Sequence, residues 1–322
     1  MLTDDVIKAQ IPYTLSKTDM PWLGEKYEGK VRDNYTKGDL RTLVVTDKLS
    51  AFDRIITTIP FKGQVLNQIA MFWFEQTKNI CPNHVVATPD PNCVIAKQCE
   101  ALPVEMVVRG YITGSTSTSI WYNYQKGVRN FCGNPLPEGL QKNQKLAHPI
   151  ITPSTKAAHG DHDESVSKEE ILSRNTVSEA DFDYMAEKAM ELYLAGVEHC
   201  AEQGIIFVDT KYEFGRDQEG NIMLIDEIHT PDSSRFWIAD TYQQKIANGE
   251  EPDNINKEYL RLWLANQGYM GDGEMPAITD EVRIETAKKY IEAYEKITGL
   301  PFQAEAGPVL DRIEQNLKNY FA

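Results

Sequence analysis

The stretch IFVDTKYEFG, residues 206–215, constrains the fold of this chain more than any other segment. It begins like a buried β-strand, but Asp209, Lys211 and Glu213 occupy every second position. Because side chains alternate between the two faces of a strand, these three charges share one face. Burying them without partners would be strongly unfavourable. We therefore expect water, countercharges or a ligand against that face.

The stretch IMLIDEIH, residues 222–229, predicts a second strand that forms a hairpin with the first. If Lys211 lies opposite Asp226, then Asp226 shares the face of Glu213. Two carboxylates and a lysine on one face would suit a Mg²⁺–phosphate site, because Mg²⁺ needs only one or two carboxylates besides phosphate oxygens. The alternative is a solvent-facing strand with cross-strand salt bridges, and the pattern alone leaves both open.

The segment HTPDSSRF, residues 229–236, follows this hairpin directly. Its Pro-Asp-Ser-Ser sequence favours a turn, which by itself only reverses the chain. Arg235 comes just after the turn, and its planar guanidinium is suited to bidentate binding of phosphate or carboxylate.

A third segment, EMVVRGYITGSTSTS (105–119), brings Arg109 to the end of a strand. We expect Gly114 and Ser115 to open a helix whose first turn is rich in hydroxyl groups. Free amides at a helix start, a serine and a nearby arginine would bind phosphate. The alternative is a capping serine beside a structural arginine.

The segment EGKVRDNY, residues 28–35, carries Lys30 and Arg32 in an expected hairpin. Such a loop would cover nucleotide phosphates, as the Gly-rich loop of a kinase does. It lacks the GxGxxG spacing and is no Walker A motif. The histidines of HGDHDE (159–164) lie in a polar loop without a regular element to orient them, so we expect no metal site there.

Composition excludes several classes of partner. The formal net charge of −15 argues against a general nucleic-acid binder. No stretch approaches the roughly 18 apolar residues of a membrane span, and the N-terminal sequence does not resemble a signal peptide. The five cysteines form no CxxC pair, which is typical of a reducing compartment. We therefore expect a cytoplasmic protein without a membrane or nucleic-acid partner.

Strands and helices are mixed without βαβ regularity, which predicts an α+β fold. We expect a first region over residues 1–100 and a second over 101–322, which ends in helices. The expected elements are a hairpin over 23–49 with its turn at 37–39, a helix over 63–79, a strand over 103–109, a helix over 115–125, a long surface loop over 130–165, and helices over 178–204, 256–267, 279–298 and 308–320.

Four of these stretches, in this order, resemble the phosphoribosylaminoimidazole-succinocarboxamide synthase (SAICAR synthetase) family of purine biosynthesis. The segment 50–70 and the helical C-terminal extension resemble the longer form of that family. The stretches that carry the resemblance are GKVRD (29–33), VEMVVRGYITGS (104–115), VDTKYEFG (208–215) and IDEIHTPDSSRFW (225–237).

The resemblance implies an ATP-dependent ligase that condenses carboxyaminoimidazole ribonucleotide with L-aspartate through an acyl phosphate, releasing ADP and phosphate. It implies a small kinase-like N-terminal lobe with an antiparallel sheet, and a larger ATP-grasp-like domain with the C-terminal helices. A small-molecule kinase of the inositol phosphate type and a non-enzymatic nucleotide-binding regulator are the alternatives.

The resemblance also implies roles for individual residues. It does not identify the L-aspartate site, for which Lys156 and the preceding TPST (152–155) are candidates only. The implied ATP-binding residues are Lys30, Arg32, Glu105 and Lys211; the magnesium ligands are Glu213 and Asp226; the ribonucleotide-binding residues are Arg109, Ser115 and Arg235; and the residues implied in catalysis are Lys211, Arg235 and Asp232.

Overall fold

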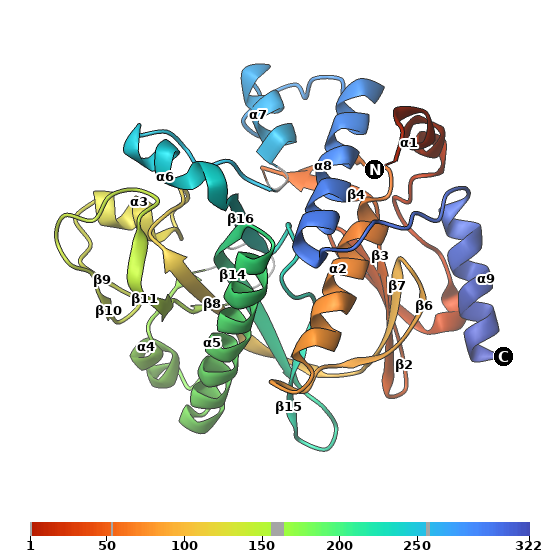
Figure 1. Cartoon of the computed structure of the whole chain (residues 1–322). Coiled ribbons are helices and arrows are strands. Elements are labelled where there is room, and N and C mark those ends of the chain that lie inside the picture. Colours follow the sequence, from red (N-terminus) through yellow and green to blue (C-terminus); the bar gives the residue numbers. More distant parts are fainter. Residues whose placement is uncertain (1, 53, 156–163, 256–257) are drawn as a thin grey trace.

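The computed structural model (Figure 1) describes residues 2–52, 54–155, 164–255 and 258–322. Its first sheet has five strands in the order β1-β2-β3-β7-β6. The hairpin expected around residues 37–39 is confirmed: β2 and β3 are joined through Gly38, whose φ of 60° favours glycine. The strands of this sheet are β1 (Glu25–Glu28), β2 (Arg32–Lys37), β3 (Leu40–Val45), β6 (Val85–Asp90) and β7 (Cys93–Lys97).

The second sheet has seven strands and is built around the long pair β8 and β14. Its path runs β13-β12-β8-β14-β15, with β11 also pairing with β8 and β16 with β14. All of these strand pairs are antiparallel, as the α+β prediction requires. Its strands are β8 (Glu100–Tyr111), β11 (Lys145–Ile151), β12 (Ser154–Thr155), β13 (Glu164–Ser165), β14 (Ile205–Arg216), β15 (Ile222–Ile225) and β16 (Ser234–Ile238).

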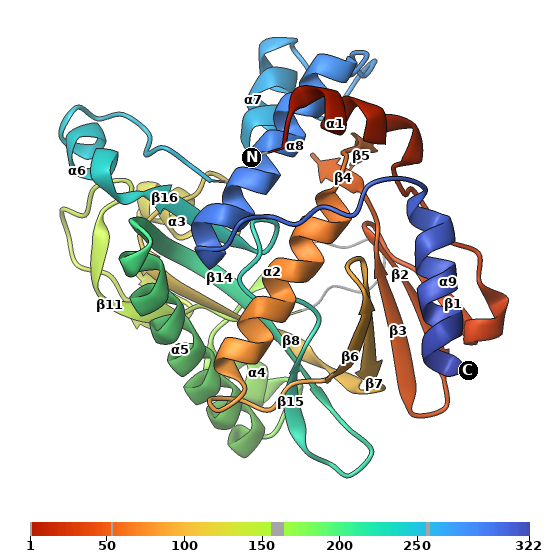
Figure 2. The ribbon, with the colours of Figure 1, turned by 45° about the vertical axis from the view of Figure 1, so that its right-hand side comes forward.

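Helix α2 (Lys62–Thr77) runs between the two sheets, and α5 (Glu179–Glu202) covers one face of the β8–β14 pair (Figure 2). A single apolar cluster joins α2, α5, α8 (Asp280–Thr298) and the second sheet; Trp73, Met185, Tyr212 and Ile291 belong to it, each almost fully buried. The helices expected over 63–79, 178–204 and 279–298 are confirmed.

The last helix, α9 (Val309–Phe321), packs on the first sheet. Its residues Val309, Ile313 and Leu317 share an apolar cluster with Tyr35 of β2 and Val44 of β3. The chain therefore returns to its N-terminal sheet at its end, and the helix expected over 308–320 is confirmed.

Two expectations for the middle of the chain are wrong. The helix expected from Ser115 is α3 and begins at Ile120. Before it, the hydroxyl groups of Thr116 and Ser119 lie 2.8 Å apart, and the Ser119 amide donates to the Thr116 carbonyl. Such local bonds of Ser and Thr compete with helix formation.

The segment expected as a loop over 130–165 contributes β11 and β12 to the second sheet, both paired with β8. Most of β11 is exposed or half-buried, so the sequence lacks the apolar alternation that predicts a strand. Of the motif at 159–164, only residue 164 lies within the described part of the chain.

The remaining elements are mostly short, and several were not expected from the sequence. The helix expected over 256–267 corresponds to α7 (Glu258–Asn266). The others are α1 (Asp4–Gln10), 3-10 turns at Ile11–Tyr13 and Pro21–Leu23, β4 (Lys48–Ala51), β5 (Arg54–Thr58), α3 (Ile120–Gln125), β9 (Asn130–Phe131), β10 (Asn134–Pro135), α4 (Lys168–Ser173) and α6 (Ala239–Ala247).

Candidate active site

The charged face of β14 contacts Glu105 of the neighbouring strand β8. Glu213 lies opposite Glu105, and Lys211 lies opposite Val107, so both charged side chains share one face with Glu105. The Lys211 ammonium donates to Glu105 Oε1 at 2.7 Å and to Glu213 Oε1 at 2.5 Å. Burial lowers the pKa of Lys211, but the carboxylates of Glu213 and Glu105 outweigh this effect and raise it above its ordinary value. Lys211 therefore stays positively charged at neutral pH.

The expected pairing of Lys211 with Asp226 is wrong, although the carboxylate of Asp226 does lie near that of Glu213. Glu213 pairs with Ile225, so Lys211 does not face Asp226. Strand β15 ends at Ile225, and Asp226 adopts a left-handed φ of 70°. This turn takes Asp226 out of the strand alternation. Burial and, to a smaller extent, the nearby charge of Glu213 raise the pKa of Asp226 to about 6, against the opposing effect of Arg32.

The first sheet supplies the opposite charge for Asp226. Arg32, the first residue of β2, donates to Asp226 and places a second nitrogen 2.7 Å from Glu227 Oε1. Burial lowers the pKa of Arg32, but these two carboxylates raise it to a net value above the ordinary one. Lys30 is exposed in the loop between β1 and β2. We call Arg32, Glu105, Lys211, Glu213 and Asp226 the Lys211 cluster.

The third charge of the face, Asp209, is held by two arginines. Arg235 of β16 donates to Asp209 Oδ2 at 2.7 Å, and an Arg109 nitrogen lies 3.7 Å from the same oxygen. Arg109 also donates to Thr152 Oγ1 at 2.7 Å and to the Thr118 carbonyl at 3.2 Å. Burial lowers the pKa of Arg109, while Asp209 opposes that shift. Arg109 therefore fastens the loop before α3 to the sheet.

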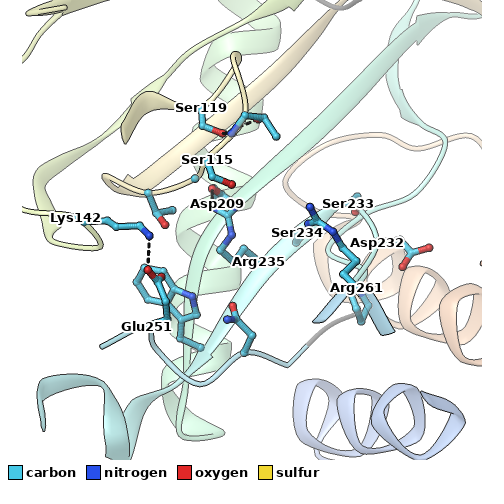
Figure 3. Close-up of a pocket in the computed structure, with 16 residues that line it drawn as sticks. Ser115, Ser119, Lys142, Asp209, Asp232, Ser233, Ser234, Arg235, Glu251 and Arg261 are labelled. Carbon is cyan, nitrogen blue, oxygen red and sulfur yellow. Dashed lines mark hydrogen bonds and ion pairs between the residues drawn. The ribbon is translucent and has the colours of Figure 1, made fainter. Parts of the chain in front are cut away.

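A polar pocket of about 320 Å³ lies over Asp209 and Arg235 (Figure 3), and we call it the Arg235 pocket. The loop before α3 lies on one side of it and the turn 231–233 on the other. Ser115, Asp232 and Arg235 line it, whereas Arg109 lies beside it. The lining residues are Thr113, Gly114, Ser115, Thr116, Ser119, Lys142, Asp209, Pro231, Asp232, Ser233, Ser234, Arg235, Trp237, Glu251, Asn254 and Arg261.

Three charged lining residues were missed from the sequence. Lys142 and Glu251 form an ion pair across one end of the pocket, and Arg261 enters from α7. The Arg261 guanidinium lies 5.4 Å from the ring of Phe52, at the tip of the β4–β5 hairpin. No local motif marks these residues, because each comes from a different loop or helix.

The expected aspartate-site segment 152–155 lies beside both groups of charges. Thr152 accepts from Arg109, and Ser154 donates to Glu105 Oε2 at 3.2 Å. Lys156, the other candidate, lies outside the described residues.

Two features are absent from the described residues. Among these residues, no group of three or more His, Cys, Asp or Glu side chains has the arrangement of a metal cage. The helices described here include none that is long and apolar enough to cross a membrane.

The comparisons with known proteins agree with one another. The family model described as SAICAR synthetase matches residues 25–277. Phosphoribosylaminoimidazole-succinocarboxamide synthase of Legionella pneumophila (strain Lens) is 50% identical over 313 residues, which are 96% of this chain and 99% of that protein. The chloroplastic synthase of Arabidopsis thaliana is 49% identical over 96% of this chain and 77% of its own length.

A solved structure of the SAICAR synthase from Saccharomyces cerevisiae, complexed with SAICAR, has a TM-score of 0.78 and 33% identity. The match covers 90% of this chain and all of that one. Together with the mixed α/β fold and its charged site, these matches define an ATP-dependent, amide-forming ligase. The chain belongs to the SAICAR synthetase family, which joins carboxyaminoimidazole ribonucleotide to L-aspartate in purine biosynthesis. The kinase alternative is not favoured.

Proposed function

We propose that the two groups of charges divide the ligase reaction between them. The Lys211 cluster binds the phosphates of ATP, and the Arg235 pocket binds the ribonucleotide. The observation that carries this proposal is the position of Asp209 and Lys211 on one face of β14, two residues and hence about 7 Å apart. That spacing would bring the γ-phosphoryl group of ATP and the substrate carboxylate together at the junction of the two sites.

Residues 1–100 would form the kinase-like lobe that covers the nucleotide, and residues 101–322 the ATP-grasp-like catalytic domain. The ion pairs of Arg32 with Asp226 and Glu227 support this division of labour, because they join the first sheet to the second at the ATP site. Lys30, in the loop before Arg32, would lie over the phosphates, and Glu105 near the nucleotide.

Glu213 and Asp226 fit the proposed magnesium site. Their carboxylate oxygens are hard ligands, and two carboxylates with substrate phosphates satisfy Mg²⁺ without a cage of three or more protein groups. When bound there, Mg²⁺ would neutralise charge on the phosphate oxygens. The positive charges of Lys211 and Arg32 already balance these carboxylates in the structure.

The chemistry requires activation of the substrate carboxylate, because an oxide is too poor a leaving group for direct amide formation. An oxygen of that carboxylate attacks the γ-phosphorus of ATP, and ADP leaves. The amine of L-aspartate then attacks the carbonyl carbon of the acyl phosphate, loses a proton and expels inorganic phosphate. Lys211, held in its charged form, donates to the transferring phosphoryl group, while binding aligns the reactants.

The Arg235 pocket would hold the phosphate of the ribonucleotide through Ser115 and Arg235, with Arg109 keeping Asp209 and the loop before α3 in place. Segment 152–155 remains our candidate for part of the aspartate site, since it touches both Arg109 and Glu105. The cytoplasmic location and the absence of a nucleic-acid partner stay predictions.

Steady-state release of ADP tests this function against the kinase alternative. With ATP, Mg²⁺ and ribonucleotide, sustained ADP release should require L-aspartate, and amide product should form in equal amount. Sustained ADP release without L-aspartate would contradict the proposal, because a kinase needs only two substrates.

A further inference from the structure

Asp232 lines the Arg235 pocket, but its carboxylate is held by two residues that lie outside that pocket. Buried Lys62 donates to Asp232 Oδ2 at 2.9 Å, and the hydroxyl of Tyr290 donates to Oδ1 at 2.7 Å. The Lys62 side chain has no exposed surface, and that of Asp232 has 12%. A carboxylate whose two oxygens accept hydrogen bonds from fixed donors is poorly placed to remove a proton from a substrate.

These donors come from distant parts of the chain. Lys62 is the first residue of α2, and Tyr290 lies in the middle of α8. The Lys62 ammonium also lies 5.3 Å from the centre of the Tyr290 ring, within reach of a cation–π contact. The match to the family model ends at residue 277, and Tyr290 lies beyond that match.

Charge and protonation state explain why Lys62, Asp232 and Tyr290 stay in contact. A fully buried ammonium needs a countercharge, which Asp232 provides. Burial and the charge of Asp232 raise the pKa of Tyr290 well above its ordinary value, so its hydroxyl stays protonated and donates. Asp232 belongs to the turn 231–233, and β16 begins directly after it with Ser234.

We propose that Tyr290 is a positioning residue of the ligase: with Lys62, it holds Asp232 and thereby the turn that presents Ser233, Ser234 and Arg235 to the ribonucleotide. Helix α8, beyond the match to the family model, thus contributes to the substrate site. This inference rests on the proposed assignment of the Arg235 pocket to the ribonucleotide.

The variant Tyr290→Phe tests it, because it removes the hydroxyl and keeps the ring. We expect kcat/KM for the ribonucleotide to fall about tenfold, as for loss of one hydrogen bond to a charged group, with KM for ATP unchanged. Tyr294→Phe is the matched control: Tyr294 is a buried tyrosine one turn along α8, whose ring packs on Phe302. It should behave as the wild type.

A double-mutant cycle shows whether Tyr290 acts through Asp232. In an Asp232→Asn background, Tyr290→Phe should cause little further loss. Fully additive losses, or Tyr290→Phe kinetics equal to those of Tyr294→Phe, would overturn the inference. So would equal losses toward ATP and ribonucleotide together with a lower unfolding temperature, since these indicate a general structural role.

Ser115→Ala separates failure of this inference from failure of the pocket assignment. If Ser115→Ala weakens ribonucleotide binding and Tyr290→Phe does not, only the role of Tyr290 is wrong. If Ser115→Ala leaves ribonucleotide binding unchanged, the pocket assignment is wrong, and the inference fails with it.

Discussion

Arg32 binds the carboxylate of Asp226, which lies 194 positions further along the chain. The contact joins the start of β2 in the five-stranded sheet to the end of β15 in the seven-stranded sheet. It explains how the half-buried carboxylate of Asp226 can lie close to that of Glu213, because a carboxylate withdrawn from water requires an opposite charge.

The magnesium assignment predicts the effect of two nearly isosteric changes. Glu213→Gln and Asp226→Asn should each lower turnover by orders of magnitude while the unfolding transition stays cooperative, because each removes a carboxylate ligand from an already polar face. Glu219→Gln, an exposed carboxylate in the turn of the same hairpin, is the control. Near-wild-type turnover of either site variant at moderate Mg²⁺ would show that the residue is not a ligand.

The Arg235 pocket predicts selective loss of ribonucleotide binding. Ser115→Ala should weaken binding of the ribonucleotide about tenfold and leave ATP binding unchanged, measured by calorimetry. Ser117→Ala, in the same exposed loop but outside the pocket lining, should bind both ligands normally. Equal weakening of both ligands by Ser115→Ala would indicate a structural role for the serine.

The buried pair of Lys62 and Asp232 predicts a large effect on stability. Asp232→Ala removes the hydrogen-bonded countercharge of the buried Lys62 ammonium, and we expect the free energy of unfolding to fall by about 3–5 kcal/mol. Urea denaturation measures this change, and the double variant Lys62→Met, Asp232→Ala should recover part of the loss. A loss below about 1 kcal/mol for Asp232→Ala alone would contradict our description of the pair.

The buried side chain of His84 should make the free energy of unfolding depend on pH. Burial lowers the pKa of His84 to about 3, and the charges of Arg32 and Arg41 add to this shift. The ordinary value is 6.5, so between about pH 6.5 and 3 the unfolded chain binds more protons at this site than the folded one. The stability that depends on a neutral His84 is therefore fully present above about pH 6.5 and is lost as the pH falls toward 3.

His84→Gln removes the titrating group and should flatten the acid side of the stability curve. The two slopes should differ by up to about 1.4 kcal/mol per pH unit inside this window. Parallel curves for wild type and variant, obtained from denaturation at a series of pH values, would contradict the prediction.

Local signals predicted much of the fold. Ser178 caps α5 by accepting from the Asp181 amide, and Gly299 ends α8 in the left-handed conformation, which are the positions that serine and glycine favour at helix ends. The alternation on β14 correctly placed Lys211 and Glu213 on one face, because that period is a property of the strand itself.

Apart from the start of α3, which local hydrogen bonds decide, the predictions that failed depended on long-range contacts. The orientation of Asp226 is decided by where β15 ends, because strand alternation no longer applies beyond that point. Lys142 and Arg261 reach the pocket through tertiary folding alone. The contact of Tyr290 with Asp232 could not be predicted from the sequence either, because 58 positions separate the two residues and no periodic pattern relates them.

Transfer of oxygen from the substrate carboxylate to phosphate tests the central claim most directly. If that carboxylate attacks the γ-phosphorus, one of its oxygens bridges carbon and phosphorus in the acyl phosphate, and amine attack then expels it with the phosphate. Ribonucleotide labelled with ¹⁸O in its carboxylate should yield inorganic phosphate that carries one labelled oxygen per turnover, detected by mass spectrometry, and only when L-aspartate is present. Unlabelled phosphate released alongside normal amide product would contradict the acyl phosphate mechanism.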